Sequence, residues 1–197
     1  MNWIVFLLII IWLYILTVLK RAKLDFWYFT VGSAGLFIVS IAVLQPVLLV
    51  PLQEAVAAVA GAVGELTGTY TGYSDKRLLF VANISLYIDL ECSGIIEIFA
   101  FLALLWFFPV YRFYEKIVVS IFGVIGIFMA NVLRVFVICQ MLFWGGDGMF
   151  FLAHSIVGRL VFYVCTIGLY FYIFTKSQFV RQKVGAFEYD VTELISS

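Results

Sequence analysis

The residues of this sequence that could do chemistry are a cysteine, an arginine and a histidine in three successive hydrophobic segments. Cys92 lies in the stretch YIDLECSGIIEIF, residues 87–99, where an apolar run begins behind two acidic residues. Arg134 and His154 lie in the next two apolar runs. Because charged side chains are costly inside a membrane-spanning segment, they usually pair with one another or serve a function.

Cys92 has the sequence position of an activated thiol. A cysteine at a helix N-terminus and beside a cation has a lowered pKa, because unpaired backbone N–H groups and the positive charge both favour the thiolate. The acidic neighbours Asp89 and Glu91 act in the opposite direction. We therefore expect Arg134 or a protonated His154 close to the sulfur, and predict a nucleophilic cysteine.

The other two residues have complementary chemical roles. His154 is the only histidine of the chain, and imidazole, with an ordinary pKa of about 6.5, can exchange a proton with a thiol and later with a leaving amine. Arg134 cannot act as a base. It could hold the thiolate, stabilise an oxyanion or bind a substrate carboxylate. Asn131, three residues earlier on the same helix face, could orient it.

Two more ionisable residues, Glu97 and Arg159, lie within the predicted spans. At 1.5 Å per helical residue, Glu97 lies about 7.5 Å deeper than Cys92. The same spacing places Arg159 about 7.5 Å deeper than the histidine. The sequence thus predicts an outer layer with the cysteine and histidine and a deeper layer with the other pair. In the structural alternative, Arg134 is only an ion-pair partner of Glu97, and the histidine is a polar cap at a span end.

The remaining cysteines and the charge balance limit the other possibilities. Cys139 and Cys165 lie deep in apolar runs and are expected to be buried small hydrophobes. Three cysteines without a CxxC spacing predict neither a disulfide framework nor a zinc site. We find no metal, nucleotide or flavin motif and expect no cofactor. Twelve basic and twelve acidic residues balance, so nothing indicates nucleic acid as a partner.

The composition is that of an integral membrane protein. Of the 197 residues, 65% are hydrophobic and 12% are charged, whereas a soluble domain carries roughly 25% charged residues. A span takes about 20 apolar residues, so we predict an all-α polytopic bundle of about five transmembrane helices in contact with the lipid bilayer. The predicted spans are residues 3–19, 26–50, 94–108, 117–143 and 150–174.

The basic residues predict the orientation of these spans. Most of them follow the first, third and fifth spans, and basic residues near span ends stay mostly on the cytoplasmic side. The N-terminus is therefore expected outside, with segment 51–92 and loop 144–149 on the extracytoplasmic side and the tail 175–197 in the cytoplasm. The whole chain, 1–197, is expected to form a single membrane domain.

The outer segment is expected to carry two small elements. The stretch EAVAAVAGAVGEL, residues 54–66, is too short to cross the membrane and predicts a short helix, either re-entrant or lying on the surface. Residues 84–91 alternate apolar and polar, as a half-buried strand does. LLFV, residues 78–81, could be the other strand of a β-hairpin that leads the chain to Cys92.

Three short motifs resemble the exosortase and archaeosortase family of membrane transpeptidases. They are ECSGI at the outer start of one span, NVLR in the next span and HSIVGRLVF at the start of the following one. The resemblance covers roughly residues 85–165, and the compact size is similar to that of the short exosortase G branch. Family members recognise a C-terminal sorting signal on exported proteins. They are thought to cleave it on the outer side through a cysteine thioester.

The resemblance implies a membrane cysteine protease or transpeptidase at the plasma membrane, with an active site that faces the extracytoplasmic side. It implies Cys92 as the nucleophile, Arg134 as the essential arginine and His154 as the third catalytic residue. The implied partner is an exported, membrane-anchored protein with a C-terminal sorting tail. The supporting residues expected from spacing alone are Asn131, Glu97 and Arg159.

A non-enzymatic protein is the alternative. In a transporter, or in an assembly factor for surface polymers, Glu97, Arg134 and Arg159 would form a polar pathway or a structural lock. The predicted spans hold few polar residues that could line an aqueous route. We therefore favour the enzyme.

Overall fold

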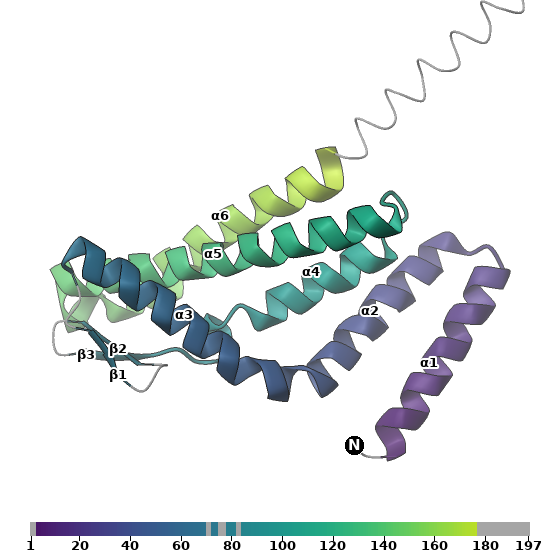
Figure 1. Ribbon diagram of the computed structural model, residues 1–197, viewed down its shortest axis with the longest axis horizontal. Helices are drawn as coiled ribbons and strands as arrows, with labels where there is room; N and C mark the ends of the chain where they lie inside the picture. The colour runs from purple at the N-terminus through teal and green to yellow at the C-terminus, as the bar shows by residue number, and fades with distance from the viewer. Residues whose placement is uncertain (1–2, 70–71, 75–77, 82–83, 177–197) are drawn as a thin grey trace, which may run out of the picture.

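The computed structural model describes residues 3–69, 72–74, 78–81 and 84–176, and these are mostly helical (Figure 1). The helices are α1 (Trp3–Arg21), α2 (Asp25–Val43), α3 (Gln45–Thr67), α4 (Ile95–Phe107), α5 (Phe113–Gly145) and α6 (Gly158–Tyr170). The strands are β1 (Gly72–Ser74), β2 (Leu78–Val81) and β3 (Ile84–Tyr87). The predicted cytoplasmic tail lies, from residue 177 on, outside the described residues.

Several helices have the length and composition of membrane spans. Within the described residues these are α2, α3, α5 and the stretch Asp147–Thr175, which contains α6, while α4 is apolar but shorter. Many large apolar side chains on these helices and on α1 are exposed at the protein surface, as lipid-facing side chains are. The prediction of an all-α polytopic membrane protein is confirmed.

The predicted span 26–50 is wrong in its second half, because the helix stops at Val43 and a new helix begins at Gln45. Pro46 stands in the first turn of α3. Proline lacks the N–H that a continuous helix would need there, and its ring clashes with the carbonyl four residues earlier, so it is tolerated at a helix start. The short helix predicted at residues 54–66 is therefore the second half of α3.

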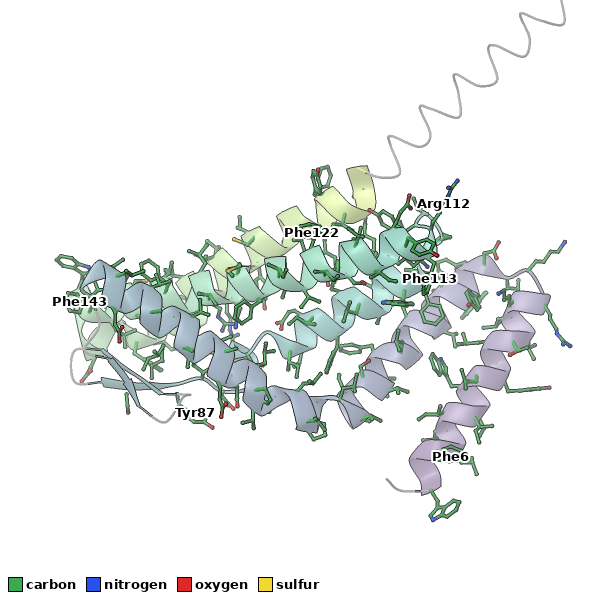
Figure 2. The ribbon with its side chains drawn as sticks, in the orientation of Figure 1. Phe6, Tyr87, Arg112, Phe113, Phe122 and Phe143 are labelled. Atoms are coloured by element: carbon green, nitrogen blue, oxygen red, sulfur yellow. The ribbon has the colours of Figure 1, made fainter. Side chains whose placement is uncertain are left out.

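The molecule is elongated, and the connections between its helices lie toward the two ends of its long axis (Figure 1). The α1–α2 and α4–α5 connections lie at one end, where Arg112 and Phe113 are labelled in Figure 2. Phe143 and Tyr87 lie toward the opposite end, where α3 runs along the far half of α5 beside the small sheet. Helix α1 packs on α2 and stands apart from the rest of the bundle.

The predicted hairpin is present. Strands β2 and β3 pair antiparallel, with Leu79 opposite Leu86, and β1 pairs with the other edge of β2. Leu86 and Ile88 are buried whereas Ser85 and Tyr87 are exposed, which is the alternation that the sequence shows. The connecting residues 82–83 lie outside the described residues. This sheet leads the chain directly to the turn that carries Cys92.

Close helix contacts at small residues hold the inner bundle together. A Cβ atom at Gly123 of α5 would collide with the ring of Phe101 on α4, and one at Gly158 of α6 would collide with Ile138 of α5. Small residues at helix interfaces let backbones approach closely in membranes. As a result α4 and α6 both pack against α5, and the side chains between them form an inner core that includes Phe101 and Phe162.

Candidate functional site

Cys92 ends a short 3₁₀ turn, Leu90–Cys92, immediately before α4. The carboxylate of Asp89 accepts a hydrogen bond from the Leu90 N–H at 2.7 Å and caps this turn. Gly94 then adopts a left-handed backbone conformation with φ of 73°, which starts α4 in a new direction. The turn and the helix are thus separate elements, and the cysteine lies between the sheet and α4.

Asn131 of α5 fixes the backbone of the cysteine. Its Nδ2 donates a hydrogen bond of 2.6 Å to the carbonyl oxygen of Cys92, and the bond is buried. We expected Asn131 to orient Arg134, and within the described residues no hydrogen bond joins the two side chains. The amide instead provides a donor for a buried carbonyl at the C-terminal end of the turn, where no helical partner is available.

Arg134, one helical turn further along α5, binds the preceding carbonyl of the same turn. Its Nη1 donates to the carbonyl oxygen of Glu91 at 2.9 Å, and its guanidinium carbon lies 5.9 Å from the ring centre of Phe162. The side chain is only 4% exposed. Its Nε is buried and has no hydrogen-bond partner among the described residues. The structural alternative, an ion pair of Arg134 with Glu97, is absent from the described part of the chain.

Arg159 forms an ion pair with Glu91, at 3.1 Å from Nη2 to Oε2. The predicted deeper layer of Arg159 and Glu97 contains no ion pair between them in the described residues, although both side chains line one cavity beside the turn. The spacing argument assumed a regular α-helix, whereas the residues before Arg159, Leu152–Val157, are π-helical. A π-helix carries more residues per turn, so it changes the level and the face at which Arg159 emerges.

His154 lies inside this π-helical segment. Its ring stacks on Phe150, with ring centres 5.6 Å apart and planes at 7°, and its Nδ1 is buried without a hydrogen-bond partner among the described residues. The charges of Arg134, Arg159 and Glu91 all act on it. The structure therefore brings the histidine into the same charged environment as Cys92. Single π-helical turns within α-helices occur frequently at functional sites.

The thiol of Cys92 is covered and protonated at rest. Cys92 is 4% exposed and belongs to the buried cluster formed by α3, the sheet and α5. Burial raises the pKa of the Cys92 thiol, and the carboxylates of Glu91 and Asp89 raise it further, while Arg134 and Arg159 act to lower it. The predicted lowering of this pKa is wrong, because desolvation disfavours the thiolate more than the two arginines favour it.

A polar cavity of about 240 Å³ opens beside the turn. Its charged lining consists of Glu91, Glu97, Arg134 and Arg159, which come from the 3₁₀ turn, α4, α5 and α6 respectively. Cys92 and His154 do not line it. The cavity therefore brings Glu97 together with both arginines, and it offers guanidinium N–H groups to a polar group that enters from outside the protein.

Sequence reasoning missed two contributors to this site. Glu91 was seen only as an unfavourable neighbour of the cysteine, although its carbonyl and carboxylate bind the two arginines. Phe162 ends the motif HSIVGRLVF, and its contact with Arg134 was not predicted, although its spacing of three from Arg159 places it on the same helix face. Within the described residues, no group of three His, Cys, Asp or Glu side chains is arranged to hold a metal ion.

Comparison with known proteins gives one family match. Residues 2–171 match the family model of the transmembrane exosortases. No curated protein and no solved structure matches the chain. The matched region contains every helix of the bundle and the whole of the site described above.

Proposed function

Because the chain belongs to the transmembrane exosortase family over residues 2–171, we propose that it is a cysteine peptidase or transpeptidase that cleaves the C-terminal sorting tails of exported proteins. The family match supports a membrane transpeptidase or sorting role in general. The nucleophile, the thioester step and the side of the membrane at which cleavage occurs are parts of the proposal. They are supported by the geometry around Cys92.

The arrangement around Arg134 carries the proposal. One N–H of its guanidinium binds the Glu91 carbonyl next to Cys92, while its buried Nε has no partner among the described residues. A buried cation without a full set of acceptors is costly, so a protein retains one where a ligand completes it. An oxygen that becomes negatively charged during acyl transfer is such a group.

The length of α5 supports cleavage at the outer face. At 1.5 Å per residue, Arg134 lies about 32 Å from Phe113 along this helix, and the hydrocarbon core of a bilayer is about 30 Å thick. Arg112 and Lys116 at the beginning of the helix favour the cytoplasmic side. Arg134 and the turn bound to it would then lie at the outer boundary of the membrane.

The proposed reaction begins with proton transfer from the Cys92 thiol to His154. The sulfur attacks the scissile carbonyl carbon, and the carbonyl electron pair moves onto the oxygen, which Arg134 stabilises through its N–H groups. When the carbonyl reforms, the C–N bond breaks and His154 returns the proton to the leaving amine. The thioester is then attacked by an amine or by water, and the thiol is released.

The covered thiol adds a requirement to this scheme. Since Cys92 is 4% exposed and protonated at rest, the residues that cover it must move when the substrate enters. The resting protein would then have little reactivity toward other electrophiles at the cell surface.

The test compares two cysteine variants in the source cells. Quantitative mass spectrometry of the C-terminal peptides of all exported proteins measures tail removal, whichever of these proteins is the substrate. We expect Cys92→Ala to abolish the removal of at least one tail, whereas Cys165→Ala, on the membrane helix α6 away from the site, keeps it. Equal processing by both variants would contradict the proposal.

A further inference from the structure

An apolar groove of about 640 Å³ lies between α4 and α6. Helix α6 and the π-helical turn after it contribute a stripe with the i, i+3, i+4 spacing of a single helix face. Helix α4 and Phe29 of α2 form the other wall. The residues of the stripe are Tyr163, Thr166, Ile167, Tyr170, Phe171 and Phe174.

Protein atoms leave much of this stripe uncovered. Ile167 is 67% exposed and Phe171 is 64% exposed, because α4 and α6 pack on α5 and leave the space between them open. On the α4 side the groove extends from Glu97 to Phe108, just past the end of α4, and on the other side from Phe162 of α6 to Thr175 in the π-helical turn that follows. These stretches are about 17 Å and about 20 Å long, which is more than half the thickness of the hydrocarbon core.

The groove leads into the polar cavity of the candidate site. Glu97, Phe162 and Tyr163 line both spaces, and Arg134 lies on the cavity side of them. A chain segment lying in the groove would therefore continue into the space beside the Cys92 turn. A lipid whose acyl chain lay in the groove and whose phosphate met the arginines is the competing occupant.

Glu97 is the charged residue of the groove lining. It is half-buried, and in the part of the chain that the structure describes it makes no hydrogen bond or ion pair. A carboxyl group at membrane depth is costly unless it finds a partner. An occupant of the groove that carries a hydrogen-bond donor at this level would provide one.

We propose that the groove docks one transmembrane helix of the substrate, and that Glu97 selects a helix with a hydrogen-bond donor near its outer end. The occupant must be helical, because a backbone in hydrocarbon has to satisfy its own polar groups. Asn, Ser or Lys side chains can supply the donor across a helix interface. This inference rests on the proposed function for the identity of the helix as a substrate.

The test measures docking without cleavage. The protein, with Cys92, Cys139 and Cys165 replaced by alanine, receives a new cysteine either at Ile167 in the groove or at Val164 on another face of α6. Val164 is a matched control, since it is 64% exposed and does not line the groove. The probe is a synthetic Leu–Ala transmembrane peptide with one cysteine, reconstituted with the protein in lipid nanodiscs. One peptide carries Asn a helical turn outside this cysteine, and a second carries Leu there.

We expect the Asn peptide to form a disulfide with Ile167→Cys several-fold more than with Val164→Cys. The Asn peptide should also exceed the Leu peptide at Ile167→Cys, and Glu97→Met should remove that difference. Equal yields at the two positions would overturn the proposal in favour of lipid as the occupant. A disulfide between two protein molecules through Ile167→Cys would overturn it in favour of a second copy of the chain.

The experiment separates docking from catalysis. The docking assay uses protein without Cys92, so its result does not depend on cleavage. If docking is preferential but Cys92→Ala cells still remove tails, the proposed function is rejected. The groove then remains a docking site for a helix. Tail removal that depends on Cys92, without preference for Ile167→Cys, would reject the docking site and leave the proposed function.

Discussion

The side-chain amide of Asn131 donates a 2.6 Å hydrogen bond to the carbonyl oxygen of Cys92, and this bond joins the middle of α5 to the turn before α4. One helical turn further along, Arg134 binds the carbonyl of the preceding residue, Glu91, at 2.9 Å. Two consecutive carbonyls of the turn are thus held by one helix. The position of the cysteine backbone follows from α5 rather than from the helix that the cysteine precedes.

Replacing Asn131 by leucine, which has a similar size, should destabilise the protein. The Cys92 carbonyl would stay buried and lose its donor, which typically costs about 1–3 kcal/mol in the free energy of unfolding. Denaturant unfolding in detergent, followed by tryptophan fluorescence, measures this change. Ser120→Ala on the same helix is the control, because the Ser120 hydroxyl is buried without a partner in the described residues. Equal destabilisation by both variants would contradict the assigned role of Asn131.

Gly94→Ala should destabilise the start of α4. Gly94 has φ of 73°, and a left-handed conformation costs an L-residue with a side chain roughly 1–2 kcal/mol. The added Cβ would also lie 3.4 Å from the Asn131 side chain that holds Cys92. Gly148→Ala, at an exposed site where a Cβ meets nothing within 4 Å, is the matched control. If thermal unfolding midpoints fall equally in both variants, the backbone argument is wrong.

The membrane class, the long apolar helices of the C-terminal half and the hairpin could be predicted, because each depends on a local pattern. An apolar run of span length and an alternating strand are visible in the sequence without any knowledge of packing. The break between α2 and α3 was missed although Pro46 marks it, because hydropathy continues unchanged across the proline. Because the first part of α3 was assigned to the preceding span, only its second part, residues 54–66, was predicted as a separate short helix.

The residues of the candidate site stay a prediction, and their pairing differs from the one expected. The charge of Arg134 acts on both Cys92 and His154. Which side chains meet depends on how deep each residue lies along its helix, and these depths were calculated for regular α-helices. The π-helical turn around His154 and the burial of Cys92 under α3 and the sheet arise from tertiary packing, which a linear spacing argument does not contain.

The pH dependence of Cys92 alkylation should reveal opposite effects of its charged neighbours. A small thiol reagent reacts with the thiolate, and burial raises the pKa of this thiol, so labelling at neutral pH should be slow and should rise toward alkaline pH. Removing a nearby positive charge by Arg134→Gln should move the apparent pKa higher. Removing a negative charge by Glu91→Gln should move it lower.

The measurement uses protein in which Cys139 and Cys165 are replaced by alanine, so that only one thiol reports. Mass spectrometry at timed intervals gives the labelling rate at each pH. Rapid labelling at neutral pH, or shifts of the same sign in Arg134→Gln and Glu91→Gln, would show that neighbouring charges do not control this cysteine.

The two arginines of the cavity should differ strongly in their importance for tail removal. Arg159 and Glu91 form an ion pair whose side chains are 46% and 64% exposed, and such pairs contribute about 0–1 kcal/mol. We therefore expect Arg159→Gln to slow processing by no more than about fivefold. Arg134→Lys keeps the buried charge but cannot both hold the Glu91 carbonyl and present the fork of N–H groups to an oxyanion.

Loss of one oxyanion donor typically costs about 10²–10³ in rate, and this is the decrease that we expect for Arg134→Lys. The rate at which cleaved tails appear in a pulse-chase experiment measures both variants on the same substrate. A small effect of Arg134→Lys beside a large effect of Arg159→Gln would exchange their roles. The exposed arginine would then contact the reacting oxygen, and Arg134 would serve to hold the turn in place.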